Sequence, residues 1–145
     1  MHQRRTFLTG LAASALLPSH AMARPALPQE CAWILGLWRS DVERTMAHFS
    51  LQGRRPSAEQ LDKIGTLFGK MTHEFLPGRL VVREENGAHV RRQEFGFRVD
   101  GFTSSTVSLV LRGRDRPPGM TLYKGDGHYL VRSGQNFEYF TKQDA

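Results

Sequence analysis

Cysteine is nearly missing from this sequence, because Cys31 is the only one among its 145 residues. A lone thiol forms no internal disulfide, so the fold must depend on its apolar core even in an oxidising compartment. Cys31 is then either a buried small apolar residue or a thiol that pairs with another chain. The residues directly before it are not the small ones that lipid attachment requires.

Long apolar runs and strong charge are also lacking. The longest apolar stretch, from Phe7 to Leu17, is too short to span a membrane. The formal net charge is only +6, and two of the positive charges fall in a segment that we expect to be removed. Such a mild excess is not the basic surface of a nucleic-acid-binding protein, so no nucleic-acid partner is expected. The length fits one domain.

The patterns that carry catalysis or metal binding are missing as well. No two histidines have the spacing of a metal motif, and Pro77 excludes a zinc-protease helix starting at His73-Glu74. Ser104-Ser105-Thr106 lacks the glycines of a nucleophile elbow. No glycine-rich phosphate loop is found. We therefore predict a protein that is not an enzyme and holds no cofactor or metal; a metal assembled from distant strands is the alternative.

The chain does have a targeting segment over residues 1–23. Arg4-Arg5 is its charged start, and the apolar stretch follows. Ala21 and Ala23 supply small residues at the two positions that a signal peptidase inspects, which predicts cleavage before Arg24.

The order Arg4-Arg5-Thr6-Phe7-Leu8 resembles the twin-arginine export signal. The resemblance implies a bacterial protein that folds in the cytoplasm and crosses the membrane folded. Its partners would be the twin-arginine translocase and signal peptidase, and its location the periplasm. The alternative is a signal peptide with an ordinary basic N-terminus, which would direct the chain to the general secretory route.

Residues 24–33 contain two prolines and are expected to form an extended lead-in to a single domain over residues 34–145. A short helical turn before Gly36 is the alternative. The apolar run Ile34 to Asp41 is expected to be the first strand of a small barrel, with Trp38 plugging one end.

Two helices are predicted directly after this strand. Ser40 is suited to be the N-cap of the first helix, which Gly53 ends. Three apolar residues of that helix have roughly helical spacing and should face the core: Val42, Met46 and Phe49. Ser57-Ala58-Glu59-Gln60 is a capping box that begins the second helix, and Gly69 closes it.

From Met71 onward the apolar periodicity changes to two, with turn signals such as Asn86-Gly87 and Asp100-Gly101. Val90 and Phe95 are an odd number of residues apart, so they cannot share one face of a regular strand. This break in the alternation predicts a bulge near Arg92-Gln93. Cutting at the turns gives seven strands in an antiparallel meander: Met71–Leu76, Arg79–Glu85, Ala88–Val99, Phe102–Arg112, Met120–Lys124, His128–Arg132 and Asn136–Thr141.

With the opening stretch the strands number eight, at which an up-and-down barrel closes around a side-chain-sized interior. The predicted class is α+β, mainly β: a small barrel, closed or open, with two helices inserted after the first strand. Gly36-Leu37-Trp38 followed by a meander is similar to the lipocalin pattern. That family packs the Trp across one end of the barrel beneath a late-strand Arg. The resemblance assigns these roles to Gly36, Trp38 and Arg132, with Lys142 as the second choice.

Three further segments are similar to a group of small bacterial lipocalin-like proteins: Leu37–Asp41, Leu67–Met71 and Glu138–Phe140. The function we expect first is binding of a small apolar or lipidic ligand at the end opposite Trp38. Four late-strand aromatic residues are the candidate lining: Tyr123, Tyr129, Phe137 and Tyr139. The alternative is that they simply fill the interior.

The second expectation is a non-catalytic envelope protein that docks on a protein partner, anionic lipid or glycan. Arg112, Arg114 and Arg116 lie close together on one loop, and guanidinium groups bind such anions in pairs of hydrogen bonds. The alternative is a solvated hairpin end in which Asp115 offsets part of the charge.

Overall fold

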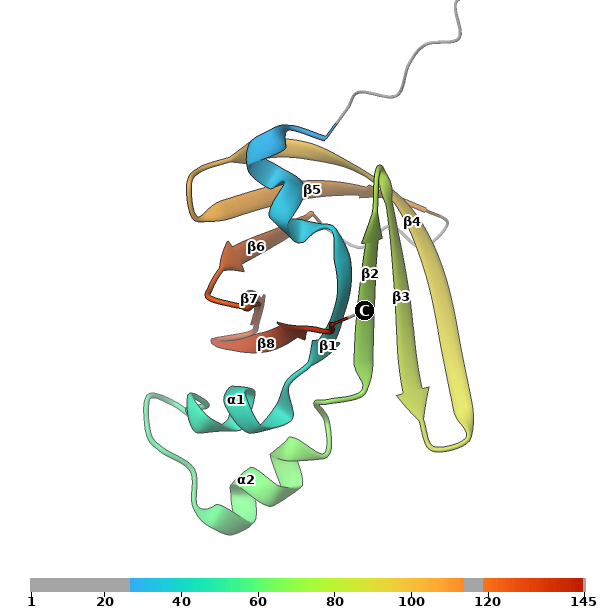
Figure 1. Ribbon diagram of the computed structural model, residues 1–145. Coiled ribbons are helices and arrows are strands. Elements are labelled where there is room, and N and C mark those ends of the chain that lie inside the picture. Colours follow the sequence, from blue (N-terminus) through green and yellow to red (C-terminus); the bar gives the residue numbers. More distant parts are fainter. Residues whose placement is uncertain (1–26, 114–118, 145) are drawn as a thin grey trace, which may run out of the picture.

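The computed structural model describes residues 27–113 and 119–144 and shows an antiparallel barrel (Figure 1). Each strand pairs with the next one along the chain, and the eighth pairs back with the first. The predicted class, mainly β with an eight-stranded meander, is therefore confirmed, and the barrel is closed.

The element bounds agree with most of the predicted segments. A 3₁₀ helix, η1 (Gln29–Ile34), precedes β1 (Gly36–Ser40), and two helices follow β1: α1 (Val42–Ala47) and α2 (Ala58–Gly65). The other strands are β2 (Met71–Leu76), β3 (Arg79–Asn86), β4 (His89–Phe102), β5 (Thr106–Arg112), β6 (Met120–Lys124), β7 (His128–Ser133) and β8 (Asn136–Lys142).

The hairpin between β3 and β4 corrects the predicted bulge. Its register runs unbroken from Arg79 opposite Gly96 to Asn86 opposite His89. The irregularity lies instead between Val99 and Gly101, where β4 continues through the predicted Asp100-Gly101 turn. Val90 is 61% exposed, because its side chain faces outward on a projecting hairpin. Neither face of that hairpin must be apolar, so the break in alternation needs no bulge.

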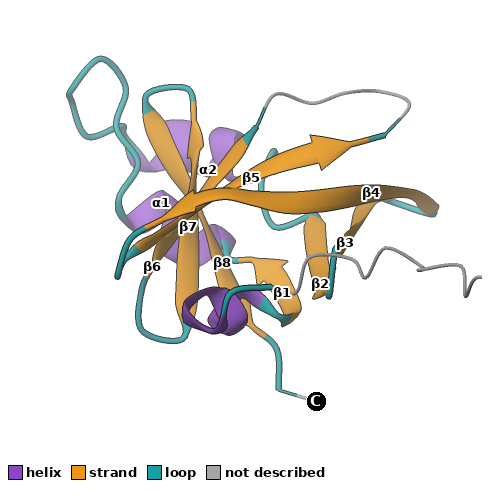
Figure 2. Cartoon of the chain, turned by 90° about the horizontal axis from the view of Figure 1, so that it is seen from above, coloured by secondary structure: helices purple, strands orange, loops and turns teal. Residues whose placement is uncertain are grey.

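One end of the barrel is closed by η1 and Trp38. Cys31 and Ile34 of η1 are fully buried, and Trp38 is 3% exposed. The indole N–H of Trp38 donates to the Ile34 carbonyl at 2.8 Å, which ties the helix to the strand. Of the two alternatives for Cys31, the structure therefore favours the buried small apolar residue. Figure 2 views the barrel from the end at which η1 lies.

The cation over Trp38 is Lys142 and not the predicted Arg132. Lys142 lies opposite Trp38 in the β1–β8 register, and its Nζ is 5.2 Å from the indole centroid. Arg132 belongs to the far end of β7, where its guanidinium lies 5.0 Å from the Phe137 ring. The cross-strand register, which sequence alone does not supply, decides between the two.

Several local predictions before β2 need correction. Residues 29–34 are helical rather than extended, as the alternative of a helical turn allowed. The N-cap of α1 is Asp41, whose carboxylate accepts from the Arg44 N–H at 2.9 Å. The capping box at Ser57 is confirmed, but α2 ends at Gly65 instead of Gly69.

Within α1, Thr45 is the buried residue, while Val42 is 38% exposed. The reason is that α1 follows the backbone edge of β8 where β1 ends. Tyr139 N–H donates to the Thr45 hydroxyl at 3.0 Å, and Asp41 N–H donates to the Tyr139 carbonyl at 2.8 Å. Asn136 makes two further bonds of 2.9 Å to the Ser50 backbone. Helix α1 and the loop that follows it therefore cover the edge of β8.

Candidate ligand site at the open end of the barrel

A cavity of about 570 Å³ lies at the barrel end away from η1. Its position follows from the register: β2 runs from Met71 at this end to Phe75, which pairs with Gly36 beside η1. Inward-facing residues of β2 to β7 form its wall, namely Met71, His73, Leu80, Val82, Gln93, Phe95, Leu111, Met120 and Val131, and the remaining lining residues are Gly119, Thr121, Tyr123 and Arg132. No residue of α1 or α2 belongs to this lining.

Among the described residues, strand pairing is incomplete beside this cavity. β4 pairs with β5 only from Gly96 onward, and β5 pairs with β6 only as far as Leu109 opposite Met120. Within residues 27–113 and 119–144, the stretch of β4 from His89 to Phe95 therefore pairs with β3 alone. The gap in pairing lies beside Gln93 and Met120, which line the cavity.

His73 is the buried ionisable side chain of the cavity wall. It is 4% exposed, and its ring stacks on Phe140 with 4.3 Å between centroids. Burial lowers the pKa of its imidazole to about 3, because a charge there would lose its hydration. The imidazole is therefore neutral at physiological pH.

The partners of His73 determine which ring nitrogen carries the proton. Nδ1 lies 2.5 Å from the Tyr129 hydroxyl, and Nε2 lies 3.3 Å from the Met71 sulfur. A thioether can only accept, whereas a hydroxyl can donate. The arrangement that satisfies both nitrogens has Tyr129 donating to Nδ1 and Nε2–H pointing at the sulfur. His73 thus offers the cavity an N–H whose protein partner is a weak acceptor.

A half-buried polar group, Glu138, has a structural role. The Ser40 hydroxyl donates to its carboxylate and accepts the Gly69 N–H at 2.9 Å. Burial raises the pKa of Glu138, while the Ser40 bond opposes that rise. The pKa of Tyr129 is raised by burial and by the charge of Glu138. Glu138 does not line the cavity; it joins β8, the end of β1 and the approach to β2.

The structure does not bring the four predicted aromatic residues together around one pocket. Tyr129 is buried in the interior against Trp38 and Phe140, with ring centroids 4.8 and 5.1 Å away, and only Tyr123 lines the cavity. Phe137 and Tyr139 alternate with inward-facing Phe140, so they lie on the outer surface. Tyr139 stacks there on His48, 5.2 Å between centroids, and Phe137 contacts Tyr123.

Sequence reasoning missed the residues that do line the cavity, above all Met71 and His73. The signal was present, because Met71, His73 and Phe75 alternate with Thr72 and Glu74 along β2. This alternation places Met71 and His73 on the interior face with the buried Phe75.

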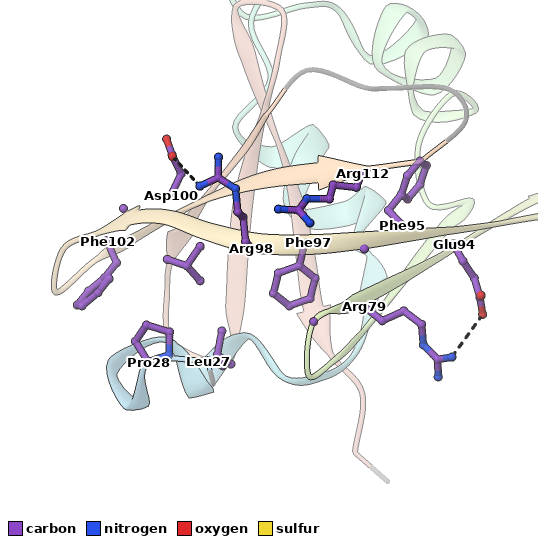
Figure 3. Close-up of a pocket in the computed structure, with 14 residues that line it drawn as sticks. Leu27, Pro28, Arg79, Glu94, Phe95, Phe97, Arg98, Asp100, Phe102 and Arg112 are labelled. Atoms are coloured by element: carbon purple, nitrogen blue, oxygen red, sulfur yellow. Dashed lines mark ion pairs between the residues drawn. The ribbon is translucent and has the colours of Figure 1, made fainter. Parts of the chain in front are cut away.

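Of the predicted arginine cluster, only Arg112 can be placed. It lies beside a second hollow, of about 860 Å³, along β4 toward the η1 end (Figure 3). Phe97, Leu27 and Pro28 lie on one side of β4 in that view, and Arg98 and Arg112 on the other. Two ion pairs neutralise charge there, Arg79–Glu94 at 3.9 Å and Arg98–Asp100 at 3.6 Å. Arg114 and Arg116 lie outside the described residues, as do the export and cleavage residues Arg4, Arg5, Phe7, Leu8, Ala21 and Ala23.

Two further searches bear on function. In the described part of the chain, no three His, Cys, Asp or Glu side chains gather in a way that could hold a metal ion. None of the helices within 27–113 and 119–144 has the length and apolar character of a membrane span.

No protein-family model matches the sequence, and no curated protein matches it. The likeness to lipocalins is therefore one of fold, carried by the closed eight-stranded barrel.

Proposed function

We propose that the protein binds a small apolar or lipidic molecule in the cavity at the open end of its barrel. The observation that supports this most is the cavity itself, about 570 Å³ with a largely apolar wall and a few polar groups. Small-molecule sites of proteins have this size and composition. The opposite end is filled by Trp38 and η1, so a ligand would approach from the side of Gln93 and Met120.

We also propose that the site binds without catalysis. The Thr121 hydroxyl is engaged with the Ser108 hydroxyl at 3.1 Å. No carboxylate is among the residues of the described chain that line the cavity. Acid–base chemistry needs a group that gains and loses a proton near neutral pH, and the neutral His73 does not.

Export to the periplasm through the twin-arginine route belongs to the same proposal. Arg4-Arg5 followed by Phe7-Leu8 supports it, and so does a barrel that needs no disulfide and can close before export. The location is tested by N-terminal sequencing of protein from the periplasmic fraction. A chain that begins at Arg24 supports the proposal, and an uncleaved chain confined to the cytoplasm contradicts it.

Replacing Val82 by Trp is expected to weaken ligand binding at least tenfold, about 1.4 kcal/mol. Val82 lies between His73 and Gln93 in the β2–β3–β4 register, so an indole there occupies cavity space. The measurement is titration with an uncharged fluorescent naphthylamine dye, with thermal unfolding as a check on the fold.

The matched control is Val110→Trp. Val110 alternates with the inward-facing Leu109 and Leu111, so its side chain is on the outer face of β5. We expect that variant to bind dye as the wild type does. Equal binding by Val82→Trp and wild type would place the dye elsewhere and contradict the cavity as the site.

A further inference from the structure

We propose that the cavity selects an uncharged apolar molecule bearing a carbonyl oxygen, which accepts a hydrogen bond from the Nε2–H of His73. This inference rests on the proposed function, because it names the class of ligand for the same cavity.

The argument starts from the poor partner of that N–H. The Met71 sulfur lies 3.3 Å from Nε2 and is a weak acceptor. A carbonyl oxygen at ordinary hydrogen-bond distance is a better one. Met71 is unbranched and flexible, and both residues line the cavity, so a ligand oxygen can replace the sulfur without disturbing the barrel.

Tyr129 fixes the direction of this donor. Its hydroxyl is fully buried and bonds to Nδ1, so the proton of the neutral ring stays on Nε2. Stacking on Phe140 also holds the ring plane. The N–H is therefore oriented before a ligand arrives, which reduces the entropy cost of the bond.

The charges of the lining residues disfavour a ligand carboxylate beside Nε2 of His73. Arg132 is the charged residue among the described lining residues, and its guanidinium lies over Phe137 rather than beside His73. A carboxylate at Nε2 would be a buried charge without a cation, which is costly. Ketones, esters and amides share the neutral acceptor that fits.

The test uses the full chain and compares two probes, of which only one carries a carbonyl oxygen. 2-Methyldodec-1-ene is dodecan-2-one with CH₂ in place of the carbonyl oxygen, so the two probes have nearly the same shape. One net hydrogen bond predicts that the ketone displaces the naphthylamine dye at roughly threefold to tenfold lower concentration. Dodecanoate should displace it less well than the ketone.

Two variants assign the preference to His73. The double variant His73→Phe with Tyr129→Phe removes both polar partners together and leaves no buried group unpaired. It should lose the preference for the ketone, so that ketone and alkene displace the dye at about the same concentration. Met71→Leu removes the sulfur, keeps an apolar side chain of similar volume, and should keep or increase that preference. The carbonyl stretch of bound ketone should lie at lower frequency than in hexane for wild type and for Met71→Leu.

The outcomes separate the two proposals. Equal displacement by ketone and alkene in wild type, tighter binding of dodecanoate, or a ketone preference that survives in the double variant would overturn the inference and leave apolar binding standing. Failure of ketone, alkene and dodecanoate alike to displace the dye would contradict the proposed function itself.

Discussion

Replacing Trp38 by Ala is expected to lower the free energy of unfolding by about 3–5 kcal/mol. Trp38 is 3% exposed and meets Tyr129 and Trp33 edge to face, with centroids 4.8 and 6.4 Å away. Its loss leaves a cavity under η1 and removes the indole bond to the Ile34 carbonyl. Small domains are stable by about 5–15 kcal/mol, so this is a large share of the total.

Urea unfolding of wild type and variant measures this effect. Trp38→Phe is the matched control, because it keeps an aromatic ring and loses the N–H that bonds to Ile34. We expect a smaller loss from that variant, with the bond contributing about 1 kcal/mol. A loss below about 1 kcal/mol for Trp38→Ala would show that the residue is peripheral and does not close the barrel.

Acid is expected to destabilise the protein through His73. Its pKa is about 3 in the folded protein against 6.5 for an unperturbed histidine, so the unfolded chain takes up a proton that the folded protein does not. The stability from this neutral group is present above pH 6.5 and is lost as the pH falls toward 3, approaching about 1.4 kcal/mol per pH unit.

Other groups act on the same pH profile and must be separated from His73. The pKa of Glu138 is raised by burial, so this group adds stability as the pH falls through its folded pKa toward 4.5. Burial tends to raise the pKa of Asp41, but hydrogen bonds from Arg44 and Thr141, together with the charges of Arg44 and His128, lower it overall, so its contribution is lost only at more acid pH, below 3.8. The slope of the wild type alone therefore does not isolate His73.

The comparison that isolates it uses the double variant His73→Phe with Tyr129→Phe. The variant retains Glu138 and Asp41, so the difference in unfolding free energy between the two proteins should shift by more than about 2 kcal/mol between pH 6.5 and 4.5, with the wild type losing more. Urea unfolding across that range is the measurement. Parallel pH profiles for the two proteins would show that His73 is not held neutral by burial.

The barrel could be predicted because its signals are local. The β3–β4 hairpin, for example, is marked by Asn86-Gly87, with a positive φ at Gly87, and alternation then gives the strands. Asp100-Gly101 is an exception, because β4 continues through it. The failures concern partners far apart in the sequence. Lys142 lies over Trp38 because β8 pairs back with β1, and Tyr129 reaches His73 across the barrel, 56 residues away. Neither contact leaves a trace in local periodicity.

The aromatic residues predicted to line one pocket do not share it, for a related reason. Residue type suggested a lining for Phe137 and Tyr139, but a strand presents alternate residues to opposite faces, which places both on the outer surface. There Tyr139 stacks on His48 at the end of α1. Polar chemistry inside the barrel was missed because burial, not spacing, makes His73 unusual.

Native mass spectrometry of protein recovered from the periplasm, beside Val82→Trp recovered in the same way, tests the binding cavity most directly. We expect the wild type to carry additional mass that disappears on denaturation, and the variant to carry little or none. A wild-type protein that is free of added mass and leaves the fluorescence of the naphthylamine dye unchanged would contradict a ligand site in the barrel.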